Sequence, residues 1–340
     1  MGKHRLNLMR RAFNPQVFHH PCVFYYNDVY KVPLPQGHRF PMEKYRMVRE
    51  RLQCLLPQGE ALFEVSPLAT TRDLCLVHDH TYVNRYRTGA FTDAENRKVG
   101  FPWSINSVNR SLSSVGGTVA ATHMVCTGKA FFAAHLAGGT HHAFRDHGEG
   151  FCIFSDIAVA ATVALRDYPK IIKKILIVDL DVHQGNGNAV LFKNEDRVFT
   201  FSMHCKQNYF SQKQTSDLDI ELPKGCTDQE YLAVLQMHLA RLFDRVQPDL
   251  VFFQAGVDVF YQDKLGKMLL TRGGLLRRNR HVYETAIFRQ VPVVITMGGG
   301  YPRDVDPAST AFREIVEVHA DVYVGAVEAL AWYREAAGLG

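Results

Sequence analysis

Short apolar runs alternate with helical patterns along most of the chain. The runs are rich in β-branched and aromatic residues and occupy residues 131–137, 156–165, 174–180, 197–203, 249–255 and 291–297. Periodic apolar positions predict helices over about 42–56, 228–246, 273–289 and 307–332. Near-continuous apolar strands separated by helices are typical of a mostly parallel sheet that is covered on both faces.

This pattern predicts an α/β fold with a single-domain, open, mostly parallel sheet flanked by helices. No fixed-period repeat, Ser/Pro-rich linker or low-complexity segment divides the 340 residues. We therefore expect one domain over residues 21–340, preceded by a basic segment, residues 1–20, with little order. The first 70 residues predict only the helix at 42–56 and leave their remaining topology open.

Polar residues follow four of the predicted strands at the point where each strand ends. In chain order they are His141 and His142, the segment Asp179–Asn186, Asp258, and Gly298–Gly300 with Tyr301. Ligands of open parallel sheets bind beyond the carboxyl ends of the strands. We therefore expect these residues to converge on one site.

The sequence D-L-D-V-H places Asp179, Asp181 and His183 at alternating positions. In extended backbone these side chains project from one face. Two carboxylates so close need a proton, a basic partner or a metal cation between them. One Asp and one His, completed by Asp258, provide three metal ligands and leave an open coordination position, which is typical of a catalytic site. The structural alternative is that these residues turn the chain or cap a helix.

Composition and charge narrow the functional classes. The formal net charge is only +5 and no basic run stands out, so we expect no direct nucleic-acid binding. No run approaches the roughly 20 apolar residues that span a bilayer. Seven cysteines without C-x-x-C spacing indicate a reducing compartment, hence a soluble intracellular protein of the cytoplasm or nucleus. The basic, acid-free first thirteen residues also fit an organelle-targeting segment that is trimmed.

The motifs GGTHHAFRDHGEGFCIFSDIA, DLDVHQGNGNA, SMH, QAGVD and GGGY together closely resemble the zinc-dependent histone deacetylase family of the arginase/deacetylase superfamily. The motifs GFPWS, SVGGT and AGVDVFYQDKLG look most like the class IV branch and its bacterial relatives. The resemblance runs from about Tyr25 to the end of the chain. It implies an arginase/deacetylase-like fold with one Zn²⁺ per chain.

The resemblance also implies two sets of metal ligands. The zinc ligands would be Asp181, His183 and Asp258. A monovalent cation, usually K⁺ in the family, would be bound by Asp179, Ser202 and the carbonyl oxygens of Asp181, His183 and Met203.

In the family's geometry the two histidines have different partners. Asp179 accepts a hydrogen bond from His141, so His141 is expected to stay charged and act electrostatically. His142 faces the neutral amide of Asn186, so it is expected to titrate near about 6.5 and to serve as general base, then acid. Tyr301 would polarise the substrate carbonyl. The walls of the acyl-lysine channel would be Phe151 with Gly150 on one side and Tyr209 or Phe210 on the other.

The implied activity is hydrolysis of the amide of Nε-acyl-lysine in a peptide or protein, with an acetyl or a longer fatty acyl group. Deacetylation of acetylated polyamines or other small amides remains an alternative, because loops and not the zinc site separate these substrates. An arginase-like ureohydrolase would need two Mn²⁺ and further carboxylates, where this chain has Gly185, Val259 and Phe260. A module that has lost catalysis is disfavoured because every expected ligand, both histidines and Tyr301 are retained.

Overall fold

The computed structural model describes residues 15–35, 37–210 and 212–338. Its centre is a single sheet whose strands are β1 (Cys22–Tyr26), β2 (Ala61–Val65), β3 (Phe132–His135), β4 (Ile175–Asp179), β5 (Val198–Cys205), β6 (Leu218–Leu222), β7 (Leu250–Gln254) and β8 (Val293–Thr296). The strands lie in the order β2-β1-β3-β8-β7-β4-β5-β6, and every pair is parallel. The predicted open, parallel α/β fold is therefore confirmed.

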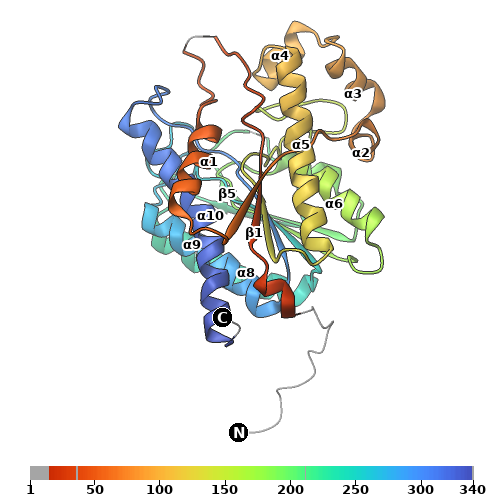
Figure 1. Cartoon of the computed structure of the whole chain (residues 1–340). Coiled ribbons are helices and arrows are strands. Elements are labelled where there is room, and N and C mark those ends of the chain that lie inside the picture. The colour runs from red at the N-terminus through yellow and green to blue at the C-terminus, as the bar shows by residue number, and fades with distance from the viewer. Residues whose placement is uncertain (1–14, 36, 211, 339–340) are drawn as a thin grey trace.

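Helices cover both faces of this sheet (Figure 1). They are the 3-10 helix η1 (Pro15–His19) and the α-helices α1 (Lys44–Leu55), α2 (Thr71–Leu74), α3 (His80–Arg87), α4 (Asp93–Val99), α5 (Ile105–Cys126), α6 (Asp156–Asp167), α7 (Asn186–Leu191), α8 (Asp228–Val246), α9 (Arg272–Arg289) and α10 (Thr310–Ala336). Helices α5 and α6 pack together on one face. On the other face, α9 packs against both α8 and α10, and α1 packs against α10.

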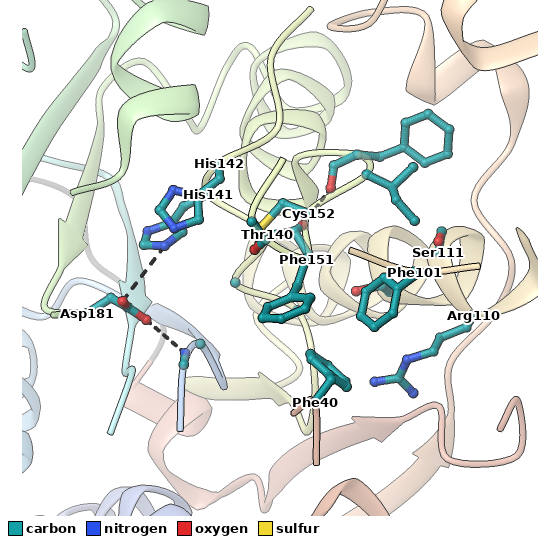
Figure 2. Close-up of a pocket in the computed structure, with 18 of the residues that line it drawn as sticks. Phe40, Phe101, Arg110, Ser111, Thr140, His141, His142, Phe151, Cys152 and Asp181 are labelled. Atoms are coloured by element: carbon teal, nitrogen blue, oxygen red, sulfur yellow. Dashed lines mark hydrogen bonds and ion pairs between the residues drawn. The ribbon is translucent and has the colours of Figure 1, made fainter. Parts of the chain in front are cut away.

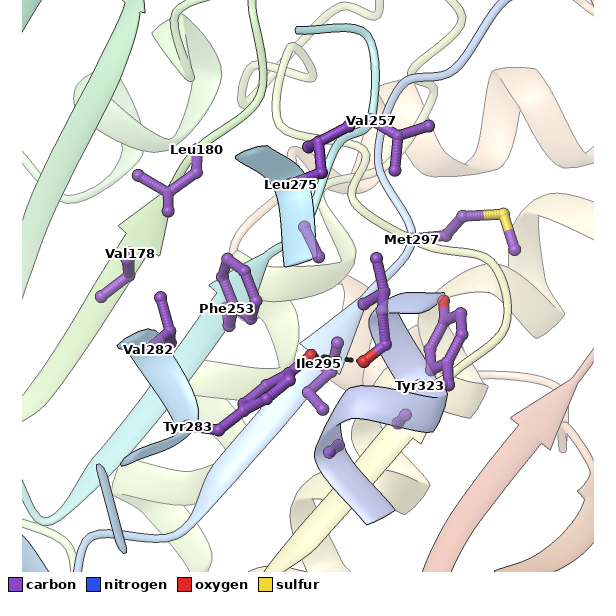
Figure 3. Packing of buried hydrophobic residues seen from close by; sticks show 14 of the residues in the cluster. Val178, Leu180, Phe253, Val257, Leu275, Val282, Tyr283, Ile295, Met297 and Tyr323 are labelled. Atoms are coloured by element: carbon purple, nitrogen blue, oxygen red, sulfur yellow. Dashed lines mark hydrogen bonds between the residues drawn. The ribbon is translucent and has the colours of Figure 1, made fainter. Parts of the chain in front are cut away.

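Alternation along each central strand divides the core into two layers. In β4, Leu176 and Val178 join the apolar cluster under α8, α9 and α10, whereas Ile175 and Ile177 join the cluster under α5 and α6. Figure 3 shows the first cluster, where Tyr283 of α9 packs above the sheet and its hydroxyl donates to a backbone carbonyl of α10 at 2.7 Å. Each fully buried aliphatic side chain contributes roughly 1.5–3 kcal/mol, so the strands form a stiff base for the loops that follow them.

The helices predicted at 42–56, 228–246, 273–289 and 307–332 are all present, as α1, α8, α9 and α10. Other elements were not expected from the pattern. The prediction of a strand for the apolar run at 156–165 is wrong, because this run forms helix α6. The helix is buried over most of its surface, so its apolar residues are nearly continuous and their pattern does not distinguish it from a buried strand. The first 70 residues contribute β1 and β2 to one edge of the sheet.

Helix α5 lacked a clear apolar stripe because it packs through small residues. A Cβ atom on Gly116 would lie 2.0 Å from the carbonyl oxygen of Pro67, and one on Gly117 would lie 2.6 Å from Nε2 of His135. Close approach of the backbone therefore replaces bulky apolar contacts along this helix.

The predicted basic segment, residues 1–20, lies mostly outside the described residues. Its described end forms η1, where Val17 and Phe18 are buried and Arg334 of α10 donates to the carbonyl of Phe18. The packed domain thus includes Val17 and Phe18. No helix among residues 15–35, 37–210 and 212–338 is long and apolar enough to cross a membrane.

Candidate active site

The candidate residues follow four strands that are neighbours at the centre of the sheet. In sheet order the strands are β3, β8, β7 and β4. Their carboxyl ends are followed by His141 and His142, by Tyr301, by Asp258, and by Asp181 and His183, respectively. Because the strands are parallel, all these side chains lie at one edge of the sheet, and the structure brings them together around one cavity.

Asp181, His183 and Asp258 form a buried group that fits a metal ion. Nδ1 of His183 lies 3.1 Å from Oδ1 of Asp181 and 3.0 Å from Oδ2 of Asp258. Potential ligand atoms of the three residues all lie within 4.8 Å of one another. Burial and the charge of Asp181 raise the pKa of Asp258 to about 6. Although burial opposes it, the nearby His141 and His183 hold the pKa of Asp181 well below its ordinary range. One imidazole nitrogen and two carboxylates are a ligand set that suits Zn²⁺.

Backbone groups orient both carboxylates of this group. Oδ1 of Asp181 accepts from the backbone N–H of His183 at 3.0 Å, and its Oδ2 accepts from that of Gly299 at 2.8 Å. Oδ1 of Asp258 accepts from the N–H of Val182 at 2.9 Å. A Cβ atom on Gly299 would lie 2.0 Å from Oδ2 of Asp258, so only glycine allows the loop after β8 to approach this closely.

The paired histidines have the two different partners that the family's geometry implies. Nδ1 of His141 lies 2.7 Å from Oδ2 of Asp179, and Nδ1 of His142 lies 2.7 Å from Oδ1 of Asn186. Burial opposes the charge of His141, but Asp179 and Asp181 outweigh it and raise the pKa of His141 to about 9. Burial and the neighbouring charge of His141 hold the pKa of His142 well below its ordinary range, so the expectation that it titrates near about 6.5 is wrong. His142 is therefore the neutral member of the pair, and the one that is able to accept a proton.

Tyr301 is held through its backbone, which leaves its ring to line the cavity. Its N–H donates to Oδ2 of Asp263 at 2.6 Å, and the preceding carbonyl, of Gly300, accepts from Nζ of Lys44 at 3.0 Å. Burial and the charge of Asp258 raise the pKa of the Tyr301 phenol well above its ordinary range, so the hydroxyl remains a donor.

Lys44 and Asp263 are residues that sequence reasoning missed. Lys44 is buried at the start of α1, and burial lowers its pKa to about 8. A lysine in the first turn of a helix is normally exposed, so no local pattern identifies it. Asp263 lies five residues after Asp258 in the quoted motif AGVDVFYQDKLG, which is the one sequence signal that pointed to this loop.

Asp156 is a third residue that the sequence did not identify. This buried carboxylate accepts from the N–H groups of Gly139 at 3.0 Å and Thr140 at 2.7 Å, and from Oγ1 of Thr118 at 2.7 Å. It therefore positions the loop that leads into His141. The one feature of the sequence that could have pointed to Asp156 is its position as an acidic residue at the start of the apolar run 156–165.

The predicted channel residues flank His142. Gly150 and Phe151 both have positive φ, 57° and 68°, and Phe151 lines the cavity. The ring of Phe210 lies 4.8 Å from that of His142, between centroids. Tyr209 lies against Phe210 and is 53% exposed. Of the two candidates for the opposite wall, Phe210 is thus the one that contacts His142.

A cavity of about 80 Å³ extends from the histidines and the metal group to helix α5. Figure 2 shows Phe40, Phe101 and Phe151 between the histidine pair and Arg110 of α5. These three rings pack against one another, with centroid distances of 4.7, 5.0 and 5.3 Å. The cavity is therefore polar at the metal group and aromatic in its middle.

Asp179 and Ser202, predicted to bind a monovalent cation, are cross-strand neighbours in β4 and β5. The Ser202 hydroxyl also lies 2.9 Å from Nδ1 of His204. Binding of K⁺ there, with the carbonyls of Asp181, His183 and Met203, stays a prediction.

Known proteins resemble this chain over most of its length. Residues 38–319 match the family described as the histone deacetylase domain. An uncharacterized protein of Picosynechococcus sp. is 44% identical over 300 residues, which cover 88% of this chain and 98% of that protein. Histone deacetylase 2 of Arabidopsis thaliana is 30% identical over 250 residues, covering 70% of this chain and 63% of that protein. Acetoin utilization protein AcuC of Staphylococcus aureus is 26% identical over 255 residues, covering 69% and 65%. The chain thus spans less than two thirds of the last two proteins.

Proposed function

The chain belongs to the histone deacetylase family, and we propose that it is a zinc-dependent hydrolase of the amide in Nε-acyl-lysine, acting on peptides or proteins. The family, shared with named histone deacetylases, supports a hydrolytic deacetylase as the general activity. The observation that carries the proposal is one cavity that joins the buried metal-binding group to the histidine pair and Tyr301. Placement in the class IV branch and binding of K⁺ belong to the same proposal.

Each residue at the cavity has a defined role in this reaction. Zn²⁺, when held by Asp181, His183 and Asp258, supplies a Lewis acid that activates water and polarises the substrate carbonyl. Because Nδ1 of His142 is bonded to Asn186, its Nε2 takes the proton from the attacking water and returns it to the departing lysine amine.

His141 and Tyr301 stabilise the negative charge that develops on the carbonyl oxygen. His141 keeps its proton because Asp179 lies at 2.7 Å, so it contributes a fixed positive charge. The Tyr301 hydroxyl donates a hydrogen bond to the oxyanion from the opposite side of the substrate.

The size of the cavity favours short acyl groups. At roughly 10–15 Å³ for each enclosed water, about 80 Å³ corresponds to roughly five to eight water-sized positions. An acetyl group fits this space together with the end of the lysine side chain. A myristoyl chain would require the packed rings of Phe40, Phe101 and Phe151 to separate.

The charges beside the channel favour a peptide over a polyamine. The exposed guanidinium of Arg39 lies over the Phe151 ring at 5.2 Å, and the exposed Lys98 pairs with Glu149 at 3.2 Å. The Arg39 guanidinium would repel a polycationic substrate, whereas the charge of Lys98 is balanced by its pairing with Glu149.

Turnover on one substrate panel tests the proposal. The panel contains acetyl-, butyryl- and myristoyl-lysine versions of one peptide, together with acetylated spermidine, and is assayed with Zn²⁺-loaded protein. We expect kcat/KM to be highest for the acetyl or butyryl peptide. Hydrolysis of the polyamine alone would show that the substrate is a small amide and not an acyl-lysine peptide. A preference for myristoyl-lysine would show that the aromatic rings move. No hydrolysis of any amide would contradict the proposal as a whole.

A further inference from the structure

Glu149 is a buried carboxylate beside the histidine pair, and the proposed reaction gives it no role. It is only 8% exposed and directly precedes the channel residues Gly150 and Phe151. Its Oε1 accepts from Nδ2 of Asn186 at 2.9 Å, and its Oε2 lies 3.2 Å from Nζ of Lys98. With the bond between Asn186 and His142, this makes a continuous chain from a surface lysine to an imidazole at the cavity.

The carboxylate determines which way the Asn186 amide faces. A side-chain amide presents a carbonyl oxygen at one edge and an NH₂ group at the other. An ionised carboxylate only accepts hydrogen bonds, so Glu149 requires the NH₂ group on its side. The amide oxygen must then face His142, whose Nδ1 must donate the hydrogen bond at 2.7 Å.

The orientation of this amide decides whether His142 is able to act as a base. With a hydrogen on Nδ1, the neutral imidazole carries its lone pair on Nε2, which is free at the cavity. If the amide turned over, its NH₂ group would face Nδ1, and the hydrogen of His142 would move to Nε2. That tautomer has no lone pair on the side of the attacking water.

We propose that Glu149 is a positioning residue that holds the Asn186 amide in one orientation and thereby keeps His142 in its Nδ1–H form. The inference rests on the proposed function for its catalytic consequence, since only a base at Nε2 makes the tautomer matter. The tautomer itself is measurable without any turnover.

The loop around Glu149 is held firmly enough for this role. The N–H of Phe151 donates to the carbonyl of Val99 at 2.8 Å, and that of Cys152 donates to the carbonyl of Glu149 at 2.9 Å. The first bond ties the loop to the end of α4, and the second closes a turn within the loop. The carboxylate therefore has a fixed position relative to both the channel wall and the histidine.

The first measurement is the ¹⁵N NMR spectrum of the imidazoles in Zn²⁺-loaded protein at pH 8. The signals of His142 are identified by their loss in His142→Gln. We expect a protonated Nδ1 and an unprotonated Nε2 in the wild type, and a mixture of both tautomers in Glu149→Ala. Glu149→Gln, which retains the size of the side chain but is able to donate as well as accept, should give a smaller change and guards against a folding defect in the alanine variant.

Kinetics on the best acyl-lysine peptide provide the second measurement. Loss of a hydrogen bond to a charged group predicts a fall in kcat of about tenfold or more in Glu149→Ala, with KM within about threefold of the wild type. Glu221→Gln is the matched control, because it removes the charge of an exposed glutamate that pairs with Lys206 at 3.0 Å, and we expect it to leave kcat unchanged.

A second-site substitution separates positioning from general loss of structure. In Glu149→Ala/Asn186→Asp, the new carboxylate only accepts, so it should restore the Nδ1–H tautomer without Glu149 and move the pH optimum upward. A wild-type tautomer and kcat in Glu149→Ala would overturn the inference. If the tautomer depends on Glu149 but the wild type hydrolyses no acyl-lysine peptide, the positioning role stands and the proposed function fails.

Discussion

The ammonium group of Lys44 is buried behind the loop that follows β8 and carries Tyr301. Replacement of Lys44 by methionine has an effect on stability that can be predicted quantitatively. The Nζ of Lys44 donates to the carbonyl of Gly300 at 3.0 Å and lies 3.4 Å from Nε2 of His319. Burial lowers the pKa from its ordinary value of 10.5 to about 8. A difference of this size corresponds to about 3 kcal/mol by which the charged lysine destabilises the fold at pH 7.

The pH dependence follows from the order of the two pKa values. The folded protein releases the Lys44 proton near pH 8, whereas the unfolded chain keeps it until about 10.5. Between these values the unfolded state binds more protons, so the contribution of Lys44 to the free energy of unfolding rises by about 1.4 kcal/mol per pH unit. Lys44→Met has no such group. The free energy of unfolding of the wild type minus that of the variant should therefore rise by about 1.6 kcal/mol between pH 8 and pH 9.5, because Lys44 of the folded protein is only half deprotonated at pH 8.

Urea unfolding of both proteins, followed by circular dichroism from pH 7 to pH 9.5, measures this difference. At pH 7 the variant should be at least as stable as the wild type, because relief of the buried charge offsets the roughly 1–3 kcal/mol for an unpaired Gly300 carbonyl. Lys193→Met, at an exposed position two residues beyond the end of α7 that is remote from the site, should give a flat difference. A flat difference for Lys44→Met as well, or a loss of more than about 3 kcal/mol at pH 7, would refute the reasoning.

Three further predictions concern the hydroxyl donor, the metal and a buried histidine. Tyr301→Phe should keep its fold and metal content but lose at least ~100-fold in kcat, and near-normal turnover would remove the tyrosine from the mechanism. Chelation should abolish turnover and lower Tm, with Zn²⁺ restoring both and a hydroxamate raising Tm further; full activity in a verified metal-free sample would exclude the zinc proposal. His78 donates from Nδ1 to the carbonyl of Phe144 at 2.8 Å and accepts at Nε2 from the N–H of Ser155 at 2.9 Å. Because burial lowers the pKa of His78 to about 4, its stabilising contribution is present above about pH 6.5 and is lost as the pH falls toward 4. Urea unfolding should therefore show His78→Gln losing less stability than the wild type over this range, and parallel losses would contradict it.

The central strands could be predicted because they are buried on both faces and therefore appear in the sequence as continuous apolar runs. In β4, β7 and β8 every residue but the last polar one is apolar and all are buried, so each strand is visible without knowledge of its neighbours. Strand β2 lies at the edge of the sheet with its side chains largely exposed, so it does not appear in the sequence as a continuous apolar run. Helix α5 depends on glycine contacts with other segments, which a hydrophobic pattern does not capture.

The residues of the site likewise divide into those that the sequence could predict and those that it could not. The metal group and the histidines lie within a few residues of strand ends, so the parallel sheet alone predicts that they meet. Glu149, Lys44 and Asp263 act through hydrogen bonds to residues that are 37, 256 and 38 positions away in the chain. Those pairings exist only after folding, and each of these residue types is usually exposed, so local sequence does not reveal their partners, although the motif AGVDVFYQDKLG contains Asp263.

The buried cations near the metal group share one property that local sequence also conceals. Arg278 is fully buried and donates to the carbonyls of Gly256 at 2.6 Å and Leu180 at 3.3 Å, which ties the loop after β7 to the loop after β4. Lys44 likewise donates to the carbonyl of Gly300. Within residues 15–35, 37–210 and 212–338, neither cation forms a direct ion pair with a carboxylate. A direct pair would occupy the oxygens of Asp181 or Asp258 and compete with a metal. Cations that bind loop carbonyls instead lower the electrostatic cost of the buried carboxylates while leaving their oxygens available as ligands.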